Sequence, residues 1–317
     1  MTEQKRPLDN FIGNKDAIAR VKLHIAAAIK RGKMPGHLAL LGPKGRGKTM
    51  LSECIAEELS SIFYIFNAAS IRSPRDMRNV LAHMCLNPAH SAVIAIDEVH
   101  ALGRGATNCL LSAMESGIVT SDYEGEIINE KITQPHLIII MTTDENRVFP
   151  PLLSRCDKIY LRPYSAEECA TIARNNIVSG GFSVDEASVN KIAERSNGEA
   201  RQVVHYARNL CDLATVCEVE MITGEITDEL FNKILKVDDL GLQERDRELL
   251  RIMSRLGTSS LETLANMMDE PKENLHQREC MLLKNGLIRI TGGGRELTSK
   301  GRGYIGESVV KTLHWRD

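Results

Sequence analysis

The sequence is poor in aromatic residues and lacks the marks of a membrane or secreted protein. Aromatic residues make up 4% of the 317 residues, and only one is Trp, so we expect an aliphatic core. No run approaches the roughly 18 apolar residues that a membrane-spanning helix needs. Residues 1–10, MTEQKRPLDN, contain no apolar signal segment. We therefore expect a soluble, cytoplasmic protein that makes no membrane contact.

The spacing of the cysteines and histidines argues against disulfides and zinc sites, and the net charge argues against a globally basic DNA-binding protein. The eight cysteines form no C-x-x-C pair, and the nine histidines form no H-x-x-x-H pair. Cys54, Cys109 and Cys169 fall inside helical patterns, which indicates small core residues in a reducing compartment rather than disulfides or zinc ligands. The formal net charge is −2, so any contact with nucleic acid must come from a local basic patch.

Residues 37–50, HLALLGPKGRGKTM, are the most informative stretch. Four apolar residues, 38–41, predict a short buried strand. Residues 42–49 then match the complete G-x-x-x-x-G-K-[ST] pattern, and residues 50–59 favour a helix. Glycines allow successive backbone N–H groups to point into one concavity at the positive end of that helix, where a triphosphate binds. Lys48 can reach the β- and γ-phosphates, and the Thr49 hydroxyl can hold Mg²⁺. The strand and helix around the motif favour nucleotide binding over a chance glycine-rich turn.

A second motif ends another predicted strand. Residues 92–96, AVIAI, are continuously apolar, as expected for a strand buried on both faces of a parallel sheet. Asp97 follows and is placed to bind Mg²⁺ through water, and Glu98 is placed to polarise the water that attacks the γ-phosphate. The alternative is an ordinary polar strand end, which the preceding phosphate-loop motif makes less probable. Residues 62–66, 135–141 and 158–161 predict further strands, so the first part of the chain is an α/β domain.

Two other segments carry weaker signals. Thr142 and Thr143 end the strand 135–141, where a hydroxyl can sense the γ-phosphate, although threonine is common at strand ends. Phe11 and Ile12 can pack on an adenine ring, but on this segment alone ordinary core packing is the better interpretation. Residues 118–132 predict a β-hairpin with an acidic tip.

The rest of the chain is predicted to be helical and then mixed. Residues 163–238 read as helices throughout, starting from a capping box at Ser165 and Glu168. Residues 239–317 predict three helices and a β-ribbon, which is the pattern of a winged helix. We therefore expect three domains: 1–162, 163–238 and 239–317. Seven cations in the last domain can form a DNA-binding surface or a solvated charged face: Lys272, Arg278, Lys284, Arg289, Arg295, Lys300 and Arg302.

The ordered set of motifs resembles the RuvB family, which drives branch migration of Holliday junctions, and more broadly the AAA+ ATPases. The resemblance covers nearly the whole chain. It is carried by RPLDNFIGN, HLALLGPKGRGKT, IAIDEVHAL, LLSAME, IIIMTTDENRVFPPLLSRCDKIYLRPYSAEEC, SNGEARQVVHYAR, VDDLGLQERDRELL and LLKNGLIRITGGGR. It implies an AAA+ P-loop domain with a parallel sheet, an all-helical lid and a C-terminal winged helix.

The resemblance also implies residue roles. Arg155 matches the arginine finger that reaches the ATP of a neighbouring subunit, so it implies a homo-oligomeric ring, most often a hexamer, around duplex or branched DNA. Arg201 matches the sensor-2 arginine, and Thr143, or else Thr142, matches sensor 1. The implied cofactors are ATP and Mg²⁺, with Thr49 and Asp97 at the metal. The implied nucleotide contacts are Phe11, Ile12, Gly42, Gly45, Gly47, Lys48, Thr49, Met50, Tyr164 and Arg201.

The chain departs from the family pattern in several places. The usual Pro-Pro-Gly-Leu of the phosphate loop is Pro43-Lys44-Gly45-Arg46, which adds two cations, and Met50 and Ala200 replace a hydroxyl residue and a proline. The wing keeps only Arg295 of a basic run, with Arg289 nearby, and these two residues are the predicted DNA contacts. The hairpin 118–132 implies a docking site for a RuvA-like partner, but its acidic residues do not fit the usual apolar contact. A non-translocating AAA+ loader or switch therefore stays open beside the DNA motor.

Overall fold

The computed structural model describes residues 7–82, 91–123, 126–132 and 136–306, and it forms two compact units. The first unit is Met1–Ile172 with Glu199–Gln202, and the second is Ala173–Gly198 with Val203–Asp317. The predicted division into three domains with boundaries at 162 and 238 stays a prediction.

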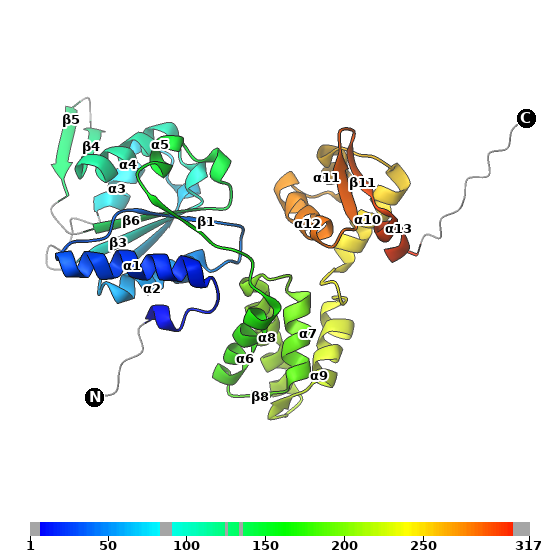
Figure 1. The fold of residues 1–317 in the computed structure, drawn as a ribbon. Coiled ribbons are helices and arrows are strands. Elements are labelled where there is room, and N and C mark those ends of the chain that lie inside the picture. The colour runs from blue at the N-terminus through cyan, green and yellow to red at the C-terminus, as the bar shows by residue number, and fades with distance from the viewer. Residues whose placement is uncertain (1–6, 83–90, 124–125, 133–135, 307–317) are drawn as a thin grey trace, which may run out of the picture. The chain divides into compact units, whose positions relative to one another are not determined.

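A five-stranded parallel sheet forms the centre of the first unit (Figure 1). Its strands are β1 (Leu38–Leu41), β2 (Ile62–Asn67), β3 (Ala92–Asp97), β6 (His136–Thr142) and β7 (Asp157–Tyr160), in the order β2-β3-β6-β1-β7. All neighbouring strands run parallel. The predicted α/β fold class is therefore confirmed.

Helices cover both faces of this sheet because alternate strand residues point to opposite sides. Ala39 and Leu41 pack in one buried cluster with residues of α3 and α4, and Leu38 and Leu40 pack in the other with residues of α1 and α2. The elements of these layers are α1 (Lys15–Arg31), α2 (Lys48–Glu58), α3 (Pro74–Ala82), α4 (Arg104–Ser116) and α5 (Pro150–Leu153), with 3-10 turns at Pro7–Asp9, Ala68–Ser70, Val99–Ala101 and Glu145–Arg147. The core is aliphatic, as expected.

The predicted hairpin is present. Strands β4 (Ile118–Tyr123) and β5 (Glu126–Lys131) pair antiparallel from Ile118–Lys131 to Tyr123–Glu126. Residues 124–125 and the side chains of residues 120–130 lie outside the described part. The proposed role of the acidic residues Asp122, Glu124, Glu126 and Glu130 therefore stays a prediction.

The helical region largely follows the sequence pattern. It contains α6 (Ala166–Ser179), α7 (Glu186–Arg195), α8 (Ala200–Val216), α9 (Gly224–Glu229) and a π-helix (Leu230–Leu235). The predicted capping box is formed, because the Glu168 carboxylate accepts from the Ser165 N–H and the Ser165 hydroxyl accepts from the Glu168 N–H. The prediction that this region is entirely helical is wrong in one detail: β8 (Ser183–Val184) and β9 (Met221–Ile222) form a short parallel pair.

The end of the second unit has the predicted winged-helix arrangement. It consists of α10 (Glu244–Leu256), α11 (Leu261–Met268), α12 (Lys272–Lys284), β10 (Ile288–Thr291), β11 (Gly294–Leu297) and α13 (Ser299–Tyr304). Ser259 adds an isolated antiparallel bridge to Arg295. Leucine residues of all three long helices share one buried core with Ile288 of β10 and Leu297 of β11. Helix α13 was not predicted, since its sequence SKGRGY lacks an apolar stripe.

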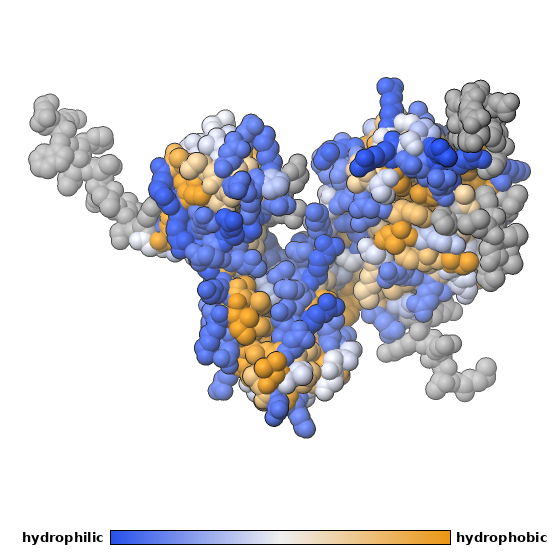
Figure 2. Space-filling model, turned by 180° about the vertical axis from the view of Figure 1, so that it is seen from behind, coloured by the Kyte–Doolittle hydropathy of each residue, from blue (hydrophilic) through white to orange (hydrophobic). Residues whose placement is uncertain are grey.

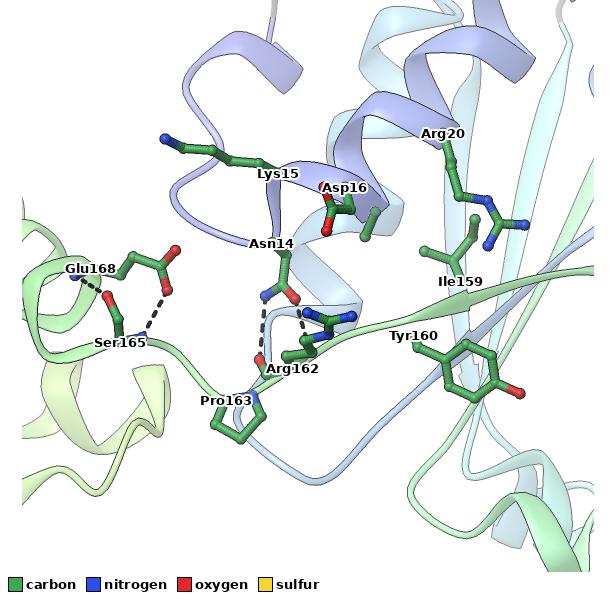
Figure 3. A pocket seen from close by; sticks show the side chains of 11 residues that line it. Asn14, Lys15, Asp16, Arg20, Ile159, Tyr160, Arg162, Pro163, Ser165 and Glu168 are labelled. Carbon is green, nitrogen blue, oxygen red and sulfur yellow. Dashed lines mark hydrogen bonds between the residues drawn. The ribbon is translucent and has the colours of Figure 1, made fainter.

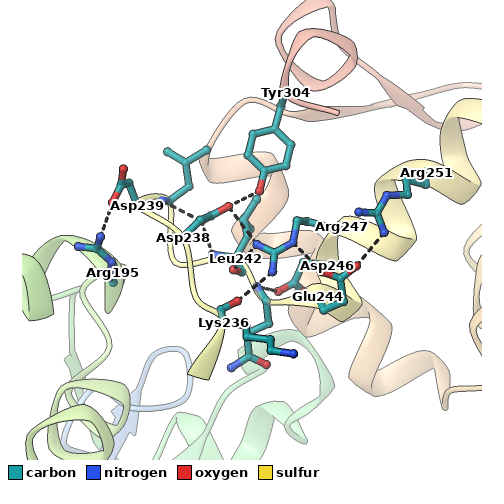
Figure 4. A network of polar contacts seen from close by, with 12 residues as sticks. Arg195, Lys236, Asp238, Asp239, Leu242, Glu244, Asp246, Arg247, Arg251 and Tyr304 are labelled. Atoms are coloured by element: carbon teal, nitrogen blue, oxygen red, sulfur yellow. Dashed lines mark hydrogen bonds and ion pairs between the residues drawn. The ribbon is translucent and has the colours of Figure 1, made fainter. Parts of the chain in front are cut away.

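Polar contacts hold the segment between the π-helix and α10 (Figure 4). Asp238 accepts hydrogen bonds from the Tyr304 hydroxyl and, at 3.5 Å, from Nη1 of Arg247. Nη2 of Arg247 donates to the Lys236 carbonyl at 2.9 Å. Arg195 is buried, donates to Asp239 and lies over the Phe231 ring at 4.8 Å from its centroid. This segment is thus tied to α7 on one side and to α10 and α13 on the other.

Most of the surface visible in Figure 2 is hydrophilic, and apolar side chains gather there only in small patches. Among the described residues, no helix combines the length and apolarity needed to cross a membrane. Cys54, Cys109 and Cys169 are buried, as the sequence predicts.

Candidate nucleotide-binding site

The candidate site lies where three adjacent strands of the sheet end. Strand β6 lies between β1 and β3, and all three run parallel. The phosphate loop follows β1. Asp97 is the last residue of β3 and Glu98 follows it, and Thr142 is the last residue of β6 and Thr143 follows it. Because the carboxyl ends of parallel strands share one edge, the sheet brings together the three segments that the sequence predicts.

The phosphate loop has the backbone shape that its glycines allow. Gly42, Gly45 and Gly47 have φ values of 147°, 70° and 83°, in a region that favours glycine. A Cβ on Gly42 would lie 2.5 Å from the Leu161 carbonyl oxygen, so no larger residue fits there. Helix α2 begins at Lys48, and its first N–H groups therefore lack partners within the helix and remain open to an anion.

Lys48 is buried in this loop and bonded to its carbonyls. Its Nζ donates to the carbonyl oxygens of Gly42 at 2.7 Å and Pro43 at 3.0 Å. Burial lowers the pKa of Lys48, and the charges of Glu98 and Asp97 oppose that shift. The ammonium is thus held by neutral carbonyl oxygens at the position where phosphate oxygens, which are stronger acceptors, would bind.

The two predicted carboxylates have different surroundings. Oδ1 of Asp97 accepts the Glu98 N–H at 3.0 Å. Glu98 has a left-handed backbone with φ of 51°, an uncommon conformation for a non-glycine residue that is frequent at functional sites. The Thr143 hydroxyl donates to Oε2 of Glu98 at 2.9 Å, and its N–H donates to the same oxygen at 3.2 Å. The structure therefore brings Glu98 together with Thr143.

Thr142 has a different role from Thr143. Its side chain is buried, and its hydroxyl donates to the Asp144 carbonyl at 3.1 Å and accepts the Asp144 N–H at 3.0 Å. Since that donor is used, Nδ1 of His100, at 2.8 Å, is the donor to this hydroxyl. The same Nδ1 lies 3.4 Å from Oε2 of Glu98. His100 is not among the predicted site residues, and its position three residues after Asp97 is the only signal that the sequence offers.

Oxygen atoms suited to Mg²⁺ are present. Thr49 is exposed at the start of α2 and supplies a hydroxyl, and Asp97 is half-buried and supplies a carboxylate. Hydroxyl, carboxylate and phosphate oxygens are the ligands that Mg²⁺ prefers. The residues present therefore fit the metal that accompanies a nucleotide at this kind of loop.

Aromatic residues cover the outer side of the loop. A Cβ on Gly47 would lie 2.6 Å from the Tyr164 hydroxyl and 3.0 Å from Cζ of Phe11, so both rings lie directly over this glycine. Phe11 is buried in the core beside α1 and α2, as its segment alone suggested. Ile12 is half-buried, while Met50 is exposed on α2. Phe11 and Tyr164 thus lie beside the phosphate loop, and their contact with adenine stays a prediction.

The first residues of α8 lie against the loop within the same unit. The Ala200 N–H donates to the Gly45 carbonyl at 3.0 Å, and a Cβ on Gly45 would lie 2.2 Å from Cγ of Glu199. Arg201 is exposed, and its charge lowers the pKa of Lys48. The structure thus places the predicted sensor-2 residue within electrostatic range of the phosphate loop.

A hollow of about 590 Å³ lies beside this region, between the start of α1 and the end of β7 (Figure 3). Asn14 and Arg162 close one side through two hydrogen bonds, Asn14 Nδ2 to the Arg162 carbonyl at 3.3 Å and the Arg162 N–H to Asn14 Oδ1 at 2.7 Å. None of the predicted nucleotide contacts lines it. This hollow is therefore distinct from the candidate nucleotide site at the phosphate loop.

Arg155, the predicted finger, lies after α5 in the first unit. Its Nη1 donates to the Pro151 carbonyl at 2.9 Å and its Nη2 to the Glu115 carboxylate at 3.0 Å. Its Nε is buried without a hydrogen-bond partner. Glu115 is exposed, so the pair lies at the surface of the unit.

The two predicted DNA contacts in the wing have carboxylate partners. Arg295 binds Glu279 through Nε at 2.5 Å and Nη2 at 3.3 Å, and the Glu279 side chain is only 3% exposed. Arg289 binds Glu296 at 2.6 Å, but its side chain is 66% exposed. Arg289 therefore remains accessible to a phosphate, whereas Arg295 is directed into its own domain.

Comparisons with known proteins agree with both halves of this architecture. The family model described as the Holliday junction DNA helicase RuvB P-loop domain matches residues 4–159, and that of the RuvB C-terminal winged helix domain matches residues 239–306. The Holliday junction branch migration complex subunit RuvB of Fervidobacterium nodosum is 29% identical, covering 96% of this chain and 88% of that protein. The RuvB branch migration motor of Thermotoga maritima superposes with a TM-score of 0.83 at 28% identity, covering 96% of this chain and 98% of the other. A mutant of that protein superposes with a TM-score of 0.84, also at 28% identity, covering 96% and 99%.

Proposed function

Because this chain belongs to the RuvB family of P-loop ATPases, we propose that it is an ATP-driven motor that moves duplex DNA and drives branch migration of Holliday junctions. One observation carries this proposal: a complete phosphate-loop site and a winged helix occur in one chain that matches a RuvB motor over 96% of its length. A DNA-binding module joined to a hydrolytic site is what a DNA motor requires.

We assign the chemistry to the residues at the strand ends. Lys48 and Arg201 hold the phosphates, and Thr49 and Asp97 hold Mg²⁺, which supplies charge neutralisation when it is bound. Glu98 polarises the attacking water, and Thr143 orients the Glu98 carboxylate through the hydroxyl contact of 2.9 Å. Phe11, Ile12 and Tyr164 shield the base.

We further propose that the chain acts as a ring in which Arg155 completes the site of the neighbouring subunit. A guanidinium at the surface of the unit, held by the exposed Glu115, supports a role in trans. When Arg155 serves a neighbour, it exchanges the Glu115 carboxylate for a phosphate, which is an equally strong partner. A ring of such shared sites fits a hexamer around DNA.

A specific observation favours a second function, a non-translocating AAA+ loader or switch. Both remaining basic residues of the wing are paired with carboxylates, Arg295 with Glu279 and Arg289 with Glu296. A wing with little free positive charge gains little from releasing counterions on DNA. In that case the chain would recruit a protein partner instead of pulling duplex.

A four-way junction assay separates the two functions. We expect the purified protein to dissociate a synthetic junction only when ATP and Mg²⁺ are present. The variant Glu98→Gln is expected to bind ATP normally and to lose at least about a hundredfold in turnover. A loader would hydrolyse ATP without dissociating the junction, and that result would replace the motor by the second function.

A further inference from the structure

Arg46 stands in the phosphate loop, immediately before Gly47 and Lys48, where the sequence departs from the family pattern. Its side chain is half-buried, and its Nε and Nη1 atoms are buried without a hydrogen-bond partner. A buried guanidinium nitrogen without an acceptor is costly, because it has lost its water and gained nothing in exchange. Such a group in a binding loop requires an explanation.

In the described part of the chain, the surroundings of Arg46 provide no acceptor for these two nitrogens. Its carbonyl oxygen accepts the Tyr164 hydroxyl at 3.3 Å, so the backbone is held in place. Burial lowers the pKa of Arg46, and the charge of Glu199 opposes this most strongly. Glu199 packs its methylene group against Gly45, and within the described residues no carboxylate forms an ion pair with Arg46. The loop therefore contains a desolvated cation whose nearest acid lies beyond ion-pair distance.

Arg46 also lies close to the predicted phosphate-binding cations. Burial is the largest cause that lowers the pKa of Lys48, and the charges of Arg201 and then Arg46 lower it further. Arg201 and Arg46 are therefore both within electrostatic range of Lys48, where like charges repel each other. An anion between them would relieve both the repulsion and the missing acceptors of Arg46.

We propose that Arg46 is a further nucleotide-binding residue of this chain, and that its Nε and Nη1 donate to an oxygen of the phosphate chain. The proposal rests on the proposed function, since it requires that the loop binds a nucleotide. Without a bound nucleotide, two buried nitrogens of Arg46 then lack acceptors, and binding of the nucleotide supplies them. Part of the binding energy thus comes from supplying acceptors to a group that was already desolvated.

The proposal predicts that replacing Arg46 stabilises the nucleotide-free protein and weakens nucleotide binding. Arg46→Leu removes the unpaired cation, so the melting temperature of the nucleotide-free protein is expected to rise. The same variant is expected to bind ATP and ADP about tenfold or more weakly, measured by competition against a fluorescent ADP, because it loses charge-assisted hydrogen bonds. Adenosine, which lacks phosphate, is expected to compete equally well with both proteins.

Two variants serve as controls. Arg46→Lys keeps the charge and is expected to recover part of the affinity. Lys44→Leu removes an exposed cation from the same loop and is expected to change ATP affinity less than threefold. An equal loss for ATP and ADP assigns the contact to the α- or β-phosphate, and a loss for ATP alone assigns it to the γ-phosphate; both results support the proposal.

A purely structural role for Arg46 gives the reverse pattern. Arg46→Leu would then lower the melting temperature of the empty protein and leave ATP and ADP affinities unchanged, and this result would overturn the proposal. Failure of the wild-type protein to bind ATP would instead overturn the proposed function. The two failures are thus distinguished by the wild-type titration.

Discussion

The hydroxyl of Thr143 donates to Oε2 of Glu98 across 2.9 Å, and the Thr143 N–H donates to the same oxygen across 3.2 Å. A carboxylate held by two donors from the neighbouring strand end cannot rotate freely. The other oxygen, Oε1, lies 3.2 Å from the same hydroxyl, so the whole carboxylate is presented in a fixed direction, as a general base requires.

Thr143→Val tests this arrangement, because valine keeps the shape and removes the hydroxyl. We expect kcat for ATP hydrolysis to fall about tenfold or more while the affinity for ATP stays nearly unchanged, since Glu98 loses orientation but the phosphate loop is intact. Single-turnover hydrolysis and nucleotide titration measure the two effects separately.

Thr142→Val is the matched control for that variant. The Thr142 hydroxyl bonds Asp144 and His100 and is buried, so its loss is expected to cost about 1–2 kcal/mol of stability. If Thr142→Val stops turnover and Thr143→Val does not, the sensor assignment moves to Thr142.

Mixing two inactive variants tests the shared site. Arg155→Ala and Glu98→Gln are each expected to lose ATPase activity when pure. Mixed rings contain interfaces at which an intact Arg155 faces an intact Glu98, so activity is expected to return in the mixture.

Arg147→Ala, which removes an exposed arginine on the same segment, is the control for Arg155 and is expected to stay active. Mixtures as inactive as their components would show that Arg155 does not complete a neighbour's site.

The ion pair between Arg295 and Glu279 predicts an effect on stability. Among the side chains that the structure describes, removing Arg295 leaves this nearly fully buried carboxylate with only His276, at 3.0 Å, as a donor. Arg295→Ala is therefore expected to lose about 2–3 kcal/mol in urea unfolding. Arg289→Ala breaks an exposed pair and is expected to cost less than about 1 kcal/mol.

The same two variants separate stability from DNA binding. Arg289→Ala is expected to weaken duplex binding and to reduce its salt dependence by about one unit of log–log slope, since one phosphate contact is lost. If the Arg295→Ala protein is folded and loses more duplex affinity than Arg289→Ala, Arg295 and not Arg289 is the main DNA contact.

His37 predicts a pH dependence. Its ring stacks on His136, its Nδ1 accepts the Ile138 N–H at 3.1 Å, and burial followed by the charge of His136 lowers its pKa from 6.5 to about 4. Between these values the unfolded chain binds a proton that the folded chain excludes. The free energy of unfolding is therefore expected to fall as the pH drops from 6.5 towards 4, by on the order of 1–3 kcal/mol.

Replacing the histidine checks the sign of this effect. In His37→Gln, part of the pH slope of the melting temperature is expected to disappear, whereas His205→Gln, at an exposed position, is expected to keep it. If the slope of melting temperature against pH is unchanged in His37→Gln, a group other than His37 causes the pH dependence.

Local sequence signals predicted the fold well where one residue type is required by geometry. Gly42 is one such position, because the Leu161 carbonyl leaves no room for a side chain there. Another is the apolar strand that ends at Asp97 and is followed by Glu98. Contacts between distant segments left no such signal. The pairing of Arg295 with Glu279, the two-residue strands β8 and β9, and the approach of His100 to Glu98 depend on the folded arrangement. The departure at Arg46 was visible in the sequence, but its missing acceptors were not.

The contacts around Asp238 have a mechanical consequence. The short segment after the π-helix is fastened to α7 by Arg195 and to α10 and α13 by Arg247 and Tyr304. A linker that is hydrogen-bonded to the structure at both ends is expected to be more rigid than one without such contacts. Rotation of α7 is therefore expected to be transmitted to α10 and α13, and replacing Asp238 is expected to weaken this coupling.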